Sequence, residues 1–351
     1  MNSDDELMEP GARTGHCMTS VGEYVILYGG HDESTSSVFN ELSSYNTLRG
    51  IWRRYQPPSD PHQGFYSSSI CANGKFVYIF GGLHSPDENE ETNSLISFDI
   101  HNASWQTLSP HTEDCDQNTP PPMFRSCIFY HSGYLYIIGG VFDYSDSDKM
   151  HKFCLKTSKW SLVSQNGVKP LILGRIFGTV YNNQFHTFDF SRPNGQTRFR
   201  NICIFDLSTY TWTTRETSSL TGLYPDDRLF ESFAFSGNLG YLSGGDSMGR
   251  YYSDIWRIDL EELQWCKLHY TLIKGICGHH TSIVDDSCLY SFGGFTDSFE
   301  NLQLFQNFTL RPPSLYRLCL ESIRRSPNFR RYAQLLPVAI VDELSLYNKN
   351  H

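Results

Sequence analysis

The sequence predicts an all-β protein, a β-propeller of six blades, and three recurring features support this prediction. Apolar strands end in a pair of glycines, a tryptophan follows most of these pairs about 20 to 23 residues later, and the unit repeats roughly every fifty residues. Self-similarity at this period, with about four short strands per unit, is typical of sheets arranged radially around a channel.

Glycine pairs identify five of the six units. They close the segments YVILYGG, KFVYIFGG, YLYIIGG, LGYLSGG and CLYSFGG, which end at Gly30, Gly82, Gly140, Gly245 and Gly294. Glycine suits these positions because it tolerates a positive φ and lets neighbouring backbone approach closely. The tryptophans are large apolar side chains, so we expect them to pack between adjacent blades: Trp52, Trp105, Trp160 and Trp265.

The remaining unit lies in the interval from Gly140 to Gly244, which is twice as long as the others. This interval contains FHTFDF, then ICIFDL and Trp212, so we interpret it as a fourth unit in which Asp189-Phe190 replaces the glycine pair. The loop that follows, SRPNGQTRF, should therefore take a different path. The six units fill residues 11–310, which predicts a propeller domain at 1–310 and a separate tail at 311–351.

The end of the sixth unit raises the question of how the ring closes. Its last segment, FENLQLFQNFTLRP, has no tryptophan strand, and an open sheet edge invites aggregation. We therefore expect residues 3–10 to supply the outer strand of the last blade.

Composition limits the class of protein. Aromatic residues make up 15% and charged residues 19% of 351 residues, as expected of a folded chain. The ten cysteines are scattered without a CxxC motif, and the acidic N-terminus does not resemble a signal peptide. No apolar stretch is long enough to span a membrane. These features predict a reduced protein of the cytoplasm, the nucleus or both, with no membrane partner.

Charge is distributed unevenly along the chain. The net charge is −10, but residues 311–351 carry +4 and the rest of the chain carries −14. An acidic body argues against a nucleic-acid partner, and the basic residues of the tail are too sparse for a nucleic-acid arm.

Arginines recur where the first strand of a unit begins. They stand in the segments GARTGH, PPMFRSC, ILGRIFG and PDDRLFES, as Arg13, Arg125, Arg175 and Arg228. Four guanidinium groups that meet at one rim would form an electropositive pocket of carboxylate size, although such arginines also bond structurally to neighbouring loops. Aromatic residues nearby would form its walls: Tyr66, Phe124, Phe177, Phe230, Tyr251 and Tyr252. The predicted substrate-binding set is Arg13, Arg125, Arg175, Arg228, Arg250, Tyr251 and His280.

No residue pattern favours catalysis, a cofactor or a metal. His279 and His280 are adjacent, and adjacent side chains of a strand point to opposite faces, so they should not share a metal ion. A Gly-rich phosphate loop and an HExxH motif are absent from the sequence. A copper-radical oxidase is the enzymatic alternative for such a propeller, but no coherent set of Tyr and His ligands is found. We therefore predict a non-enzymatic protein without a cofactor.

The tail predicts a helix with one narrow apolar stripe. Pro312-Pro313 ends the preceding strand and Ser314 is a good N-cap. The stripe is formed by Leu315, Leu318, Cys319 and Ile323, whereas the charged residues, Arg317 among them, point elsewhere. After a break at SPNF, the segment LLPVAIVDEL predicts a second helix that begins near Pro337, with Leu336, Ile340, Val341 and Leu344 on its apolar side.

Two family resemblances follow from these segments. The spacing, the glycine pairs and the tryptophans look like Kelch repeats over nearly the whole body. WD-type blades, the alternative at this period, are disfavoured because the sequence has no Trp-Asp dipeptide. PSLYRLCLESIRR looks like a BC-box, the elongin C-binding helix of SOCS-box and VHL-box substrate receptors, and LLPVAIVDEL resembles the adjoining cullin-contacting segment.

Together these segments resemble a small family of Kelch-domain receptors for cullin-RING ubiquitin ligases. The resemblance implies that Leu315, Leu318, Cys319 and Ile323 contact elongin C in an elongin B/elongin C complex. It also implies that Leu336, Pro337 and Val341 contact cullin-2, with cullin-5 as the alternative, together with a RING subunit. In that family the propeller binds C-terminal degron peptides of protein substrates, several of which end in glycine.

A second class of function stays open at this stage. The chain could be a Kelch scaffold, for instance on actin or a signalling kinase, whose helical tail packs on its own propeller.

Overall fold

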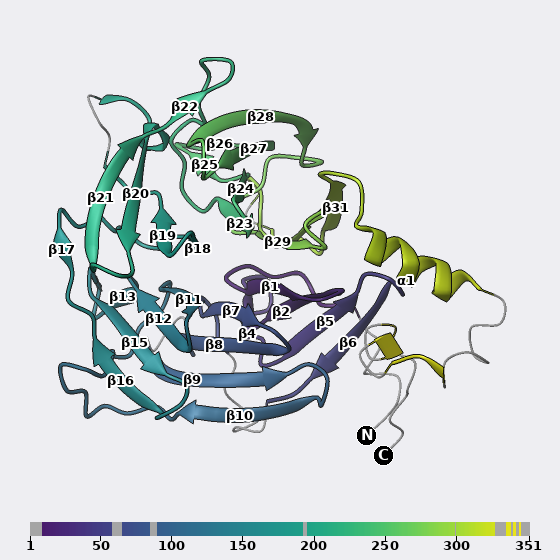
Figure 1. The fold of residues 1–351 in the computed structure, drawn as a ribbon, viewed down its shortest axis with the longest axis horizontal. Coiled ribbons are helices and arrows are strands. Elements are labelled where there is room, and N and C mark those ends of the chain that lie inside the picture. Colours follow the sequence, from purple (N-terminus) through teal and green to yellow (C-terminus); the bar gives the residue numbers. More distant parts are fainter. Residues whose placement is uncertain are drawn as a thin grey trace.

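The computed structural model describes residues 9–57, 65–84, 90–191, 195–298, 300–326, 335–337, 340–341 and 344. Six largely antiparallel sheets stand radially around a central channel, and the helix that follows the last sheet projects from the ring (Figure 1). The predicted six-bladed propeller with a short C-terminal helix is confirmed.

The first three blades each contain four strands. Blade 1 is formed by β1 (Cys17–Val21), β2 (Tyr24–Tyr28), β5 (Leu42–Asn46) and β6 (Ile51–Tyr55). Blade 2 is formed by β7 (Ser69–Asn73), β8 (Phe76–Leu83), β9 (Glu91–Asp99) and β10 (Ser104–Ser109). Blade 3 is formed by β11 (Cys127–His131), β12 (Tyr134–Ile138), β15 (Met150–Cys154) and β16 (Lys159–Leu162).

Blades 4 and 5 contain five strands each, and blade 6 contains three. Blade 4 has β18 (Gly178–Tyr181), β19 (Gln184–Thr187), β20 (Asn201–Asp206), β21 (Thr211–Glu216) and the parallel outer β17 (Asn166–Gly167). Blade 5 has β23 (Ser232–Ser236), β24 (Leu239–Ser243), β27 (Asp254–Asp259), β28 (Gln264–Thr271) and the parallel outer β22 (Ser218–Ser219). Blade 6 has β29 (His280–Val284), β30 (Cys288–Phe292) and β31 (Phe305–Thr309).

Short hairpins extend from one face of the ring. They are β3 (His31–Asp32) with β4 (Ser37–Val38), β13 (Val141–Phe142) with β14 (Ser145–Asp146), and β25 (Asp246–Ser247) with β26 (Arg250–Tyr251). A 3-10 turn, η3 (Arg198–Arg200), precedes β20 in blade 4, and the helix α1 (Leu315–Arg325) follows β31.

Glycine pairs lie at the junctions that follow five of the six blades, all except blade 4. At Gly29 (φ +64°), an added Cβ would lie 2.1 Å from the carbonyl oxygen of Phe65 in the following blade, so no other residue fits there. The second glycine donates a backbone hydrogen bond across the same junction, from Gly30 N to Phe65 O at 3.0 Å.

The tryptophans pack between blades, as predicted. Trp105 of blade 2 lies 6.3 Å from the Tyr28 ring of blade 1, and Trp160 of blade 3 lies 5.8 Å from the Phe80 ring of blade 2. Trp265 of blade 5 contacts the Phe188 ring of blade 4 in the same way.

The ring closes between blade 6 and blade 1 by the contacts used at the other junctions. Gly294 N donates to Arg13 O at 3.0 Å, and Trp52 packs 5.2 Å from the Phe305 ring. The predicted outer strand at residues 3–10 falls mostly on residues outside the described part of the chain, and Glu9 and Pro10 form no strand.

Candidate functional site

Six residues with a left-handed backbone surround one end of the channel, one from each blade. Each precedes the first strand of its blade and has a φ between 55° and 67°: Gly15, Ser67, Arg125, Gly174, Phe230 and Gly278. Backbone hydrogen bonds link neighbouring members, for example from Arg125 N to Ser67 O at 2.8 Å. Among these six, Arg125 and Phe230 carry large side chains. We call this end of the channel the channel mouth.

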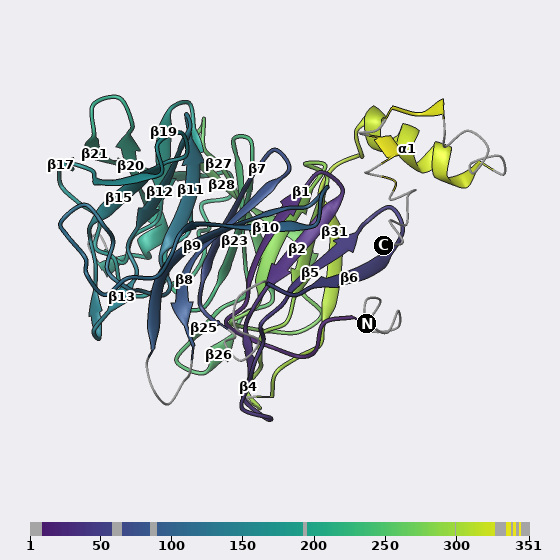
Figure 2. The same ribbon diagram turned by 90° about the horizontal axis from the view of Figure 1, so that it is seen from below.

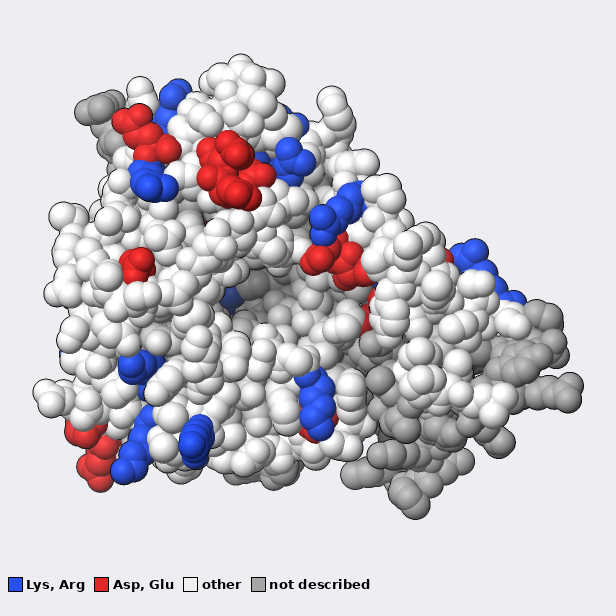
Figure 3. All heavy atoms as spheres, in the orientation of Figure 1, with Lys and Arg blue, Asp and Glu red and all other residues white. Residues whose placement is uncertain are grey.

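The first strands of all six blades line a cavity of about 350 Å³ inside the channel. In the space-filling view the channel appears as a hollow at the centre of the ring (Figure 3). Its wall is rich in hydroxyl and thiol groups, among them those of Ser20, Ser69, Cys71, Ser126, Cys127 and Thr281. Arg175 is the one Lys, Arg, Asp or Glu residue among the described lining residues, so the cavity carries a net positive charge.

Arg175 reaches from the blade 4 entrance to the opposite side of the channel. Its Nη1 lies 2.6 Å from His280 Nε2 in blade 6, and its Nη2 donates to Ser68 O in blade 2 at 3.1 Å. No described carboxylate forms an ion pair with it. Burial, which is the main cause, lowers the pKa of the Arg175 guanidinium to about 10. It therefore stays charged at neutral pH and can pair with an incoming anion.

Two buried histidines, His16 and His280, lie near this guanidinium, whereas the buried His279 points to blade 5, where its Nε2 lies 2.9 Å from Ser243 Oγ. His280 accepts its hydrogen bond through Nε2, because a guanidinium can only donate, so His280 is neutral. The His16 ring lies 5.0 Å from the His280 ring. Burial and then the charges of nearby arginines hold the pKa of His16 and His280 well below the ordinary range, and burial lowers the pKa of His279 to about 3. The histidines thus shape the channel mouth without adding charge.

Arg125 is the second cation at the channel mouth. Its guanidinium carbon lies 5.5 Å from the Phe124 ring centre and 5.8 Å from the Phe230 ring centre. Burial lowers its pKa, and the nearby charge of Tyr66 and Asp146 opposes that shift. Because Leu229 and Phe230 are half exposed beside it, this side of the channel mouth combines a cation with apolar surface.

Arg13 and Arg228 serve the fold, in place of their predicted role in substrate binding. Both are buried, and both donate from Nη1 to the first glycine of a pair, to Gly29 O at 3.0 Å and to Gly244 O at 3.1 Å. Each also forms an ion pair within its own blade, Arg13 with Glu41 at 2.8 Å and Arg228 with Asp254 at 2.6 Å. Both side chains are held inside their blades, and Nη2 of Arg228 is buried without a hydrogen-bond partner, so Arg125 and Arg175 are the two predicted arginines that stay at the channel mouth.

Arg250 and Tyr251 lie on the β25–β26 hairpin of blade 5. Arg250 is exposed, 3.6 Å from Asp226 and 4.9 Å from the Tyr252 ring centre. Tyr251 is half-buried. These two residues stand on the hairpin, whereas Arg125, Arg175 and His280 come together at the channel mouth.

Arg198 was missed by sequence reasoning. It is buried, pairs with Glu231, and reaches Asp189 O at 3.4 Å and Arg228 O at 3.5 Å. Its side chain therefore bridges blades 4 and 5, whereas the junctions after blades 1, 2, 5 and 6 use a backbone hydrogen bond from the second glycine. The loss of the glycine pair in the fourth unit was the signal that a side chain had to make this junction.

The segment Gly245–Gly249 has the GxSxG spacing of a hydrolase nucleophile motif, but its structure differs. It forms part of the β25–β26 hairpin, whereas that nucleophile stands on a turn from strand to helix. The described residues contain no group of three or more side chains suited to hold a metal. They also contain no helix long and apolar enough to cross a membrane.

The helix α1 begins as predicted and exposes most of its predicted stripe. Ser314 caps it by accepting a hydrogen bond from Arg317 N at 3.1 Å. Leu315 is 81% exposed and Leu318 45% exposed, and Cys319 is also exposed. Ile323, the fourth predicted member, is partly buried against a cluster formed by Leu48, Leu320 and Leu344.

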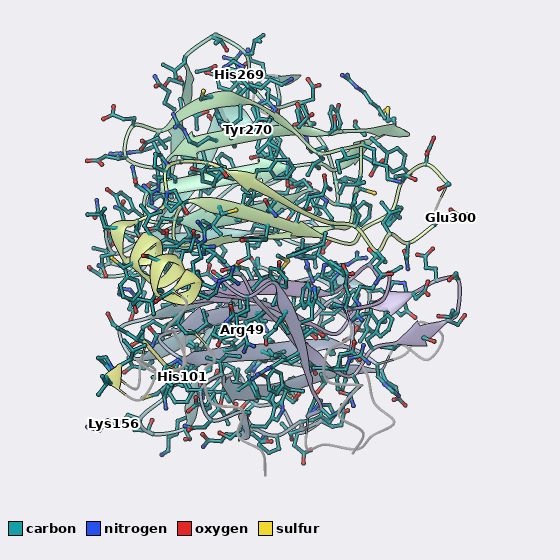
Figure 4. All side chains as sticks on the ribbon, turned by 90° about the vertical axis from the view of Figure 1, so that its right-hand side faces the viewer. Arg49, His101, Lys156, His269, Tyr270 and Glu300 are labelled. Carbon is teal, nitrogen blue, oxygen red and sulfur yellow. The ribbon has the colours of Figure 1, made fainter. Side chains whose placement is uncertain are left out.

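The opposite side of α1 packs on the propeller, and Arg317, which lies away from the stripe as predicted, belongs to this docked side. Arg317 is only 7% exposed and pairs with Glu23, while Leu320 is 1% exposed. The helix lies against the outer edge of the ring, and Figure 4 shows it at the opposite edge from Glu300. In Figure 2, α1 lies toward one face of the ring and the β3–β4 and β25–β26 hairpins lie toward the other.

Of the predicted cullin-contacting residues, Val341 lies in a short helical turn after α1, and Leu336 and Pro337 precede that turn. Backbone hydrogen bonds of 3.0 Å run from Val341 N to Pro337 O and from Leu344 N to Ile340 O. Pro337 is exposed, Leu336 is half-buried and Val341 is buried. Val341 therefore packs inward in this structure, whereas Pro337 is accessible to a partner.

A family model built on Kelch repeats matches residues 15–189 and 191–311, and its description is the KLHDC2/KLHL20/DRC7 Kelch-repeats domain. The chain belongs to this Kelch-repeat family.

Curated Kelch relatives extend the match over most of the chain. Kelch domain-containing protein 10 of Rattus norvegicus is 24% identical over 354 residues, which cover 95% of this chain and 85% of that protein. The Homo sapiens protein of the same name is 23% identical, with coverages of 95% and 79%. Kelch domain-containing protein 2 of Bos taurus is 25% identical over 308 residues, with coverages of 83% and 65%.

The Kelch propeller is a protein-interaction module. The candidate binding features of this chain are the two cations at its channel mouth, Arg125 and Arg175, and the exposed stripe on its tail helix.

Proposed function

We propose that this Kelch protein is a substrate-recognition adaptor of a cullin-RING ubiquitin ligase. The observation that carries the proposal is the division of α1 into two faces. One face is docked on the propeller, while Leu315, Leu318 and Cys319 are exposed side by side on the other. An exposed row of apolar side chains on a well-formed helix is expected to meet a partner, and its sequence resembles the helix that binds elongin C.

The partner half of the proposal assigns this exposed face to elongin C. Leu315 would insert into an apolar pocket, and the small side chain of Cys319 would let the partner approach the helix closely. Pro337 and the neighbouring half-buried Leu336 would contact the cullin, which we propose to be cullin-2. The assembly would act in the cytoplasm, the nucleus or both.

The substrate half of the proposal assigns the channel mouth to the C-terminal carboxylate of a captured protein. Arg175 has no described carboxylate partner, and Arg125 is close enough at the channel mouth for its charge to act on Arg175. Two guanidinium groups suit a terminal carboxylate, because each can donate two hydrogen bonds to the two oxygens. The exposed Phe230 would pack against the residue that precedes the terminus.

In this proposal the chain performs no chemistry of its own. Its contribution is proximity, because it holds a substrate lysine near a conjugating enzyme that the RING subunit recruits. The isopeptide bond is then formed by those other subunits.

Reconstituted ubiquitin transfer tests the proposed function. The purified chain would be combined with elongin B, elongin C, cullin-2, a RING subunit and a charged conjugating enzyme. Reporter proteins would carry a library of C-terminal peptides with free carboxylates. We expect ubiquitin transfer to a subset of reporters that depends on the chain. Equal transfer with and without the chain would contradict the proposal.

Peptide capture should be insensitive to pH between 6 and 8. The pKa values of His16, His279 and His280 are lowered, so these rings stay neutral throughout this range. The pKa of Arg175 is about 10, so it stays charged, as does a terminal carboxylate. Fluorescence anisotropy with a peptide from the library should give dissociation constants within about twofold at pH 6 and pH 8. Marked tightening at pH 6 would mean that a histidine binds the carboxylate as a cation.

A scaffold with a self-docked tail is the second candidate, and the packing of Arg317 and Leu320 favours it. The two functions differ in the role of the exposed face of α1. A scaffold would keep its partners when Leu315 is changed to aspartate, whereas the adaptor would lose elongin C.

A further inference from the structure

The contact between α1 and the propeller is built around a buried ion pair. Arg317 Nη1 donates to Glu23 and, at 3.0 Å, to Thr47 Oγ1, while Arg317 Nε lies 3.3 Å from Glu321 on the same helix. Glu23 is 3% exposed and Arg317 is 7% exposed. The guanidinium is thus held between the turn that joins β1 to β2 and the turn that joins β5 to β6.

Two further contacts surround this pair. Leu320 packs on Leu48, next to Thr47, in a cluster completed by Leu344. At the start of the helix, Ser314 N donates to Asp285 Oδ2 at 2.9 Å, in the turn that joins β29 to β30 of blade 6. The helix therefore spans the junction between the first and the last blade.

A buried ion pair contributes little net stability, because removing both charges from water offsets their attraction. Its geometry is restrictive, however. An apolar contact such as Leu320 on Leu48 tolerates rotation and sliding of the helix. The guanidinium can satisfy Glu23 and Thr47 together in one arrangement only.

The contact also fixes the position of α1 relative to the channel mouth. The turns that hold Arg317 lie at the far ends of strands that begin at the channel mouth. A five-residue strand such as β1 spans roughly 17 Å, so α1 and the channel mouth lie on opposite faces of the ring. This relation agrees with the view in Figure 2.

We propose that Arg317 and Glu23 act as an orientation lock between the two binding surfaces. The lock holds the stripe of Leu315, Leu318 and Cys319 outward and at a fixed angle to the channel mouth. This inference rests on the proposed function, since the angle matters when a substrate on one face must reach an enzyme recruited by the other. Loss of a rigid connection lowers the effective concentration of the captured lysine at that enzyme.

The test compares Glu23→Ala with the double variant Glu23→Leu/Arg317→Met in the full-length chain. The double variant replaces the pair by apolar side chains, so its melting temperature should return to within about 2 °C of the wild-type value. Spin labels on unnatural amino acids at Arg324 and His101 report the position of α1 relative to blade 2. We expect one narrow distance distribution in the wild-type chain and a broad one in both variants.

Elongin affinity and ubiquitin transfer are measured on the same variants as these distances. Elongin affinity should stay within about twofold in both variants because Leu315 and Cys319 are unchanged, while ubiquitin transfer should fall about tenfold. A narrow distribution in the stable double variant would overturn the lock, because apolar packing would then suffice to orient the helix. A broad distribution with undiminished transfer would also overturn it. Failure of the wild-type chain to bind elongins would instead contradict the proposed function.

Discussion

Changing Leu315 and Cys319 together to aspartate is expected to abolish binding of the elongin B/elongin C complex. Each change would place an unpaired carboxylate in an apolar interface. Central side chains of such interfaces contribute about 2 kcal/mol or more each, so the affinity should fall at least roughly 1000-fold. Isothermal titration of purified elongin B/elongin C into the chain measures this loss.

The same double variant should leave the propeller intact. Both side chains are exposed on α1, so their replacement removes no contact that holds the helix to blade 1. The melting temperature should change by no more than about 2 °C. The matched control changes Leu220 and Leu223 to aspartate, because these residues are 60% and 61% exposed but lie between β22 and β23 of blade 5. Elongin binding that survives the changes at Leu315 and Cys319 but is lost in this control would reverse the assignment of the partner surface.

Amidation of the C-terminus of a captured peptide is expected to cost about 2–5 kcal/mol of binding free energy, or roughly 30-fold to several thousand-fold in affinity. The cost arises because Arg125 and Arg175 would lose the charge that they pair with in a partly dehydrated channel mouth. Anisotropy measurements with matched free and amidated peptides test this expectation. Equal affinities would mean that an internal motif is bound.

Arg175→Gln should reproduce the effect of amidation on the protein side. The free-acid peptide should bind more weakly to this variant, and amidation should then cost little more. The variant should fold well, because Arg175 forms no ion pair with a described carboxylate and its burial disfavours the charged form. Arg250→Gln is the control, since Arg250 is exposed on the β25–β26 hairpin and does not line the cavity. An equal loss in both variants would indicate a diffuse electrostatic effect.

The propeller could be predicted from the sequence because its blade junctions depend on local chemistry. A residue such as Gly29, at positive φ and next to the carbonyl of Phe65, admits no substitute, so the pattern survives in each typical unit. In the fourth unit the junction moved to Arg198, whose partner Glu231 is 33 residues away. A pairing at that distance leaves no local periodicity in the sequence.

The channel mouth could be predicted only in part. Four arginines near the starts of first strands look alike in the sequence. Their positions relative to the left-handed residue differ by a few residues, and this difference decides whether the side chain points into its blade or toward the channel. Arg13 and Arg228 precede the left-handed residue by two positions and turn into their blades toward Glu41 and Asp254. Arg125 occupies the left-handed position itself and stays at the channel mouth, whereas Arg175 follows that position in blade 4 and lines the cavity.

The tail shows a similar limit. The spacing of Leu315, Leu318 and Cys319 predicts an apolar stripe, and the stripe is present. Periodicity alone suggests that the apolar face docks on the propeller and the charged face meets water. In the structure Arg317 is docked on the propeller and Leu315 and Leu318 are exposed. Arg317 is docked because Glu23 and Thr47 accept its hydrogen bonds, and Glu23 is 294 residues away in the sequence.

Co-expression of the wild-type chain with elongin B and elongin C, followed by size-exclusion chromatography with light scattering, tests the central claim most directly. We expect a complex of one copy of each protein that stays together through purification. It should dissociate when Leu315 and Cys319 are both changed to aspartate. Elution of the wild-type chain apart from the elongins would contradict it, and the exposed face of α1 would then have to serve a different partner.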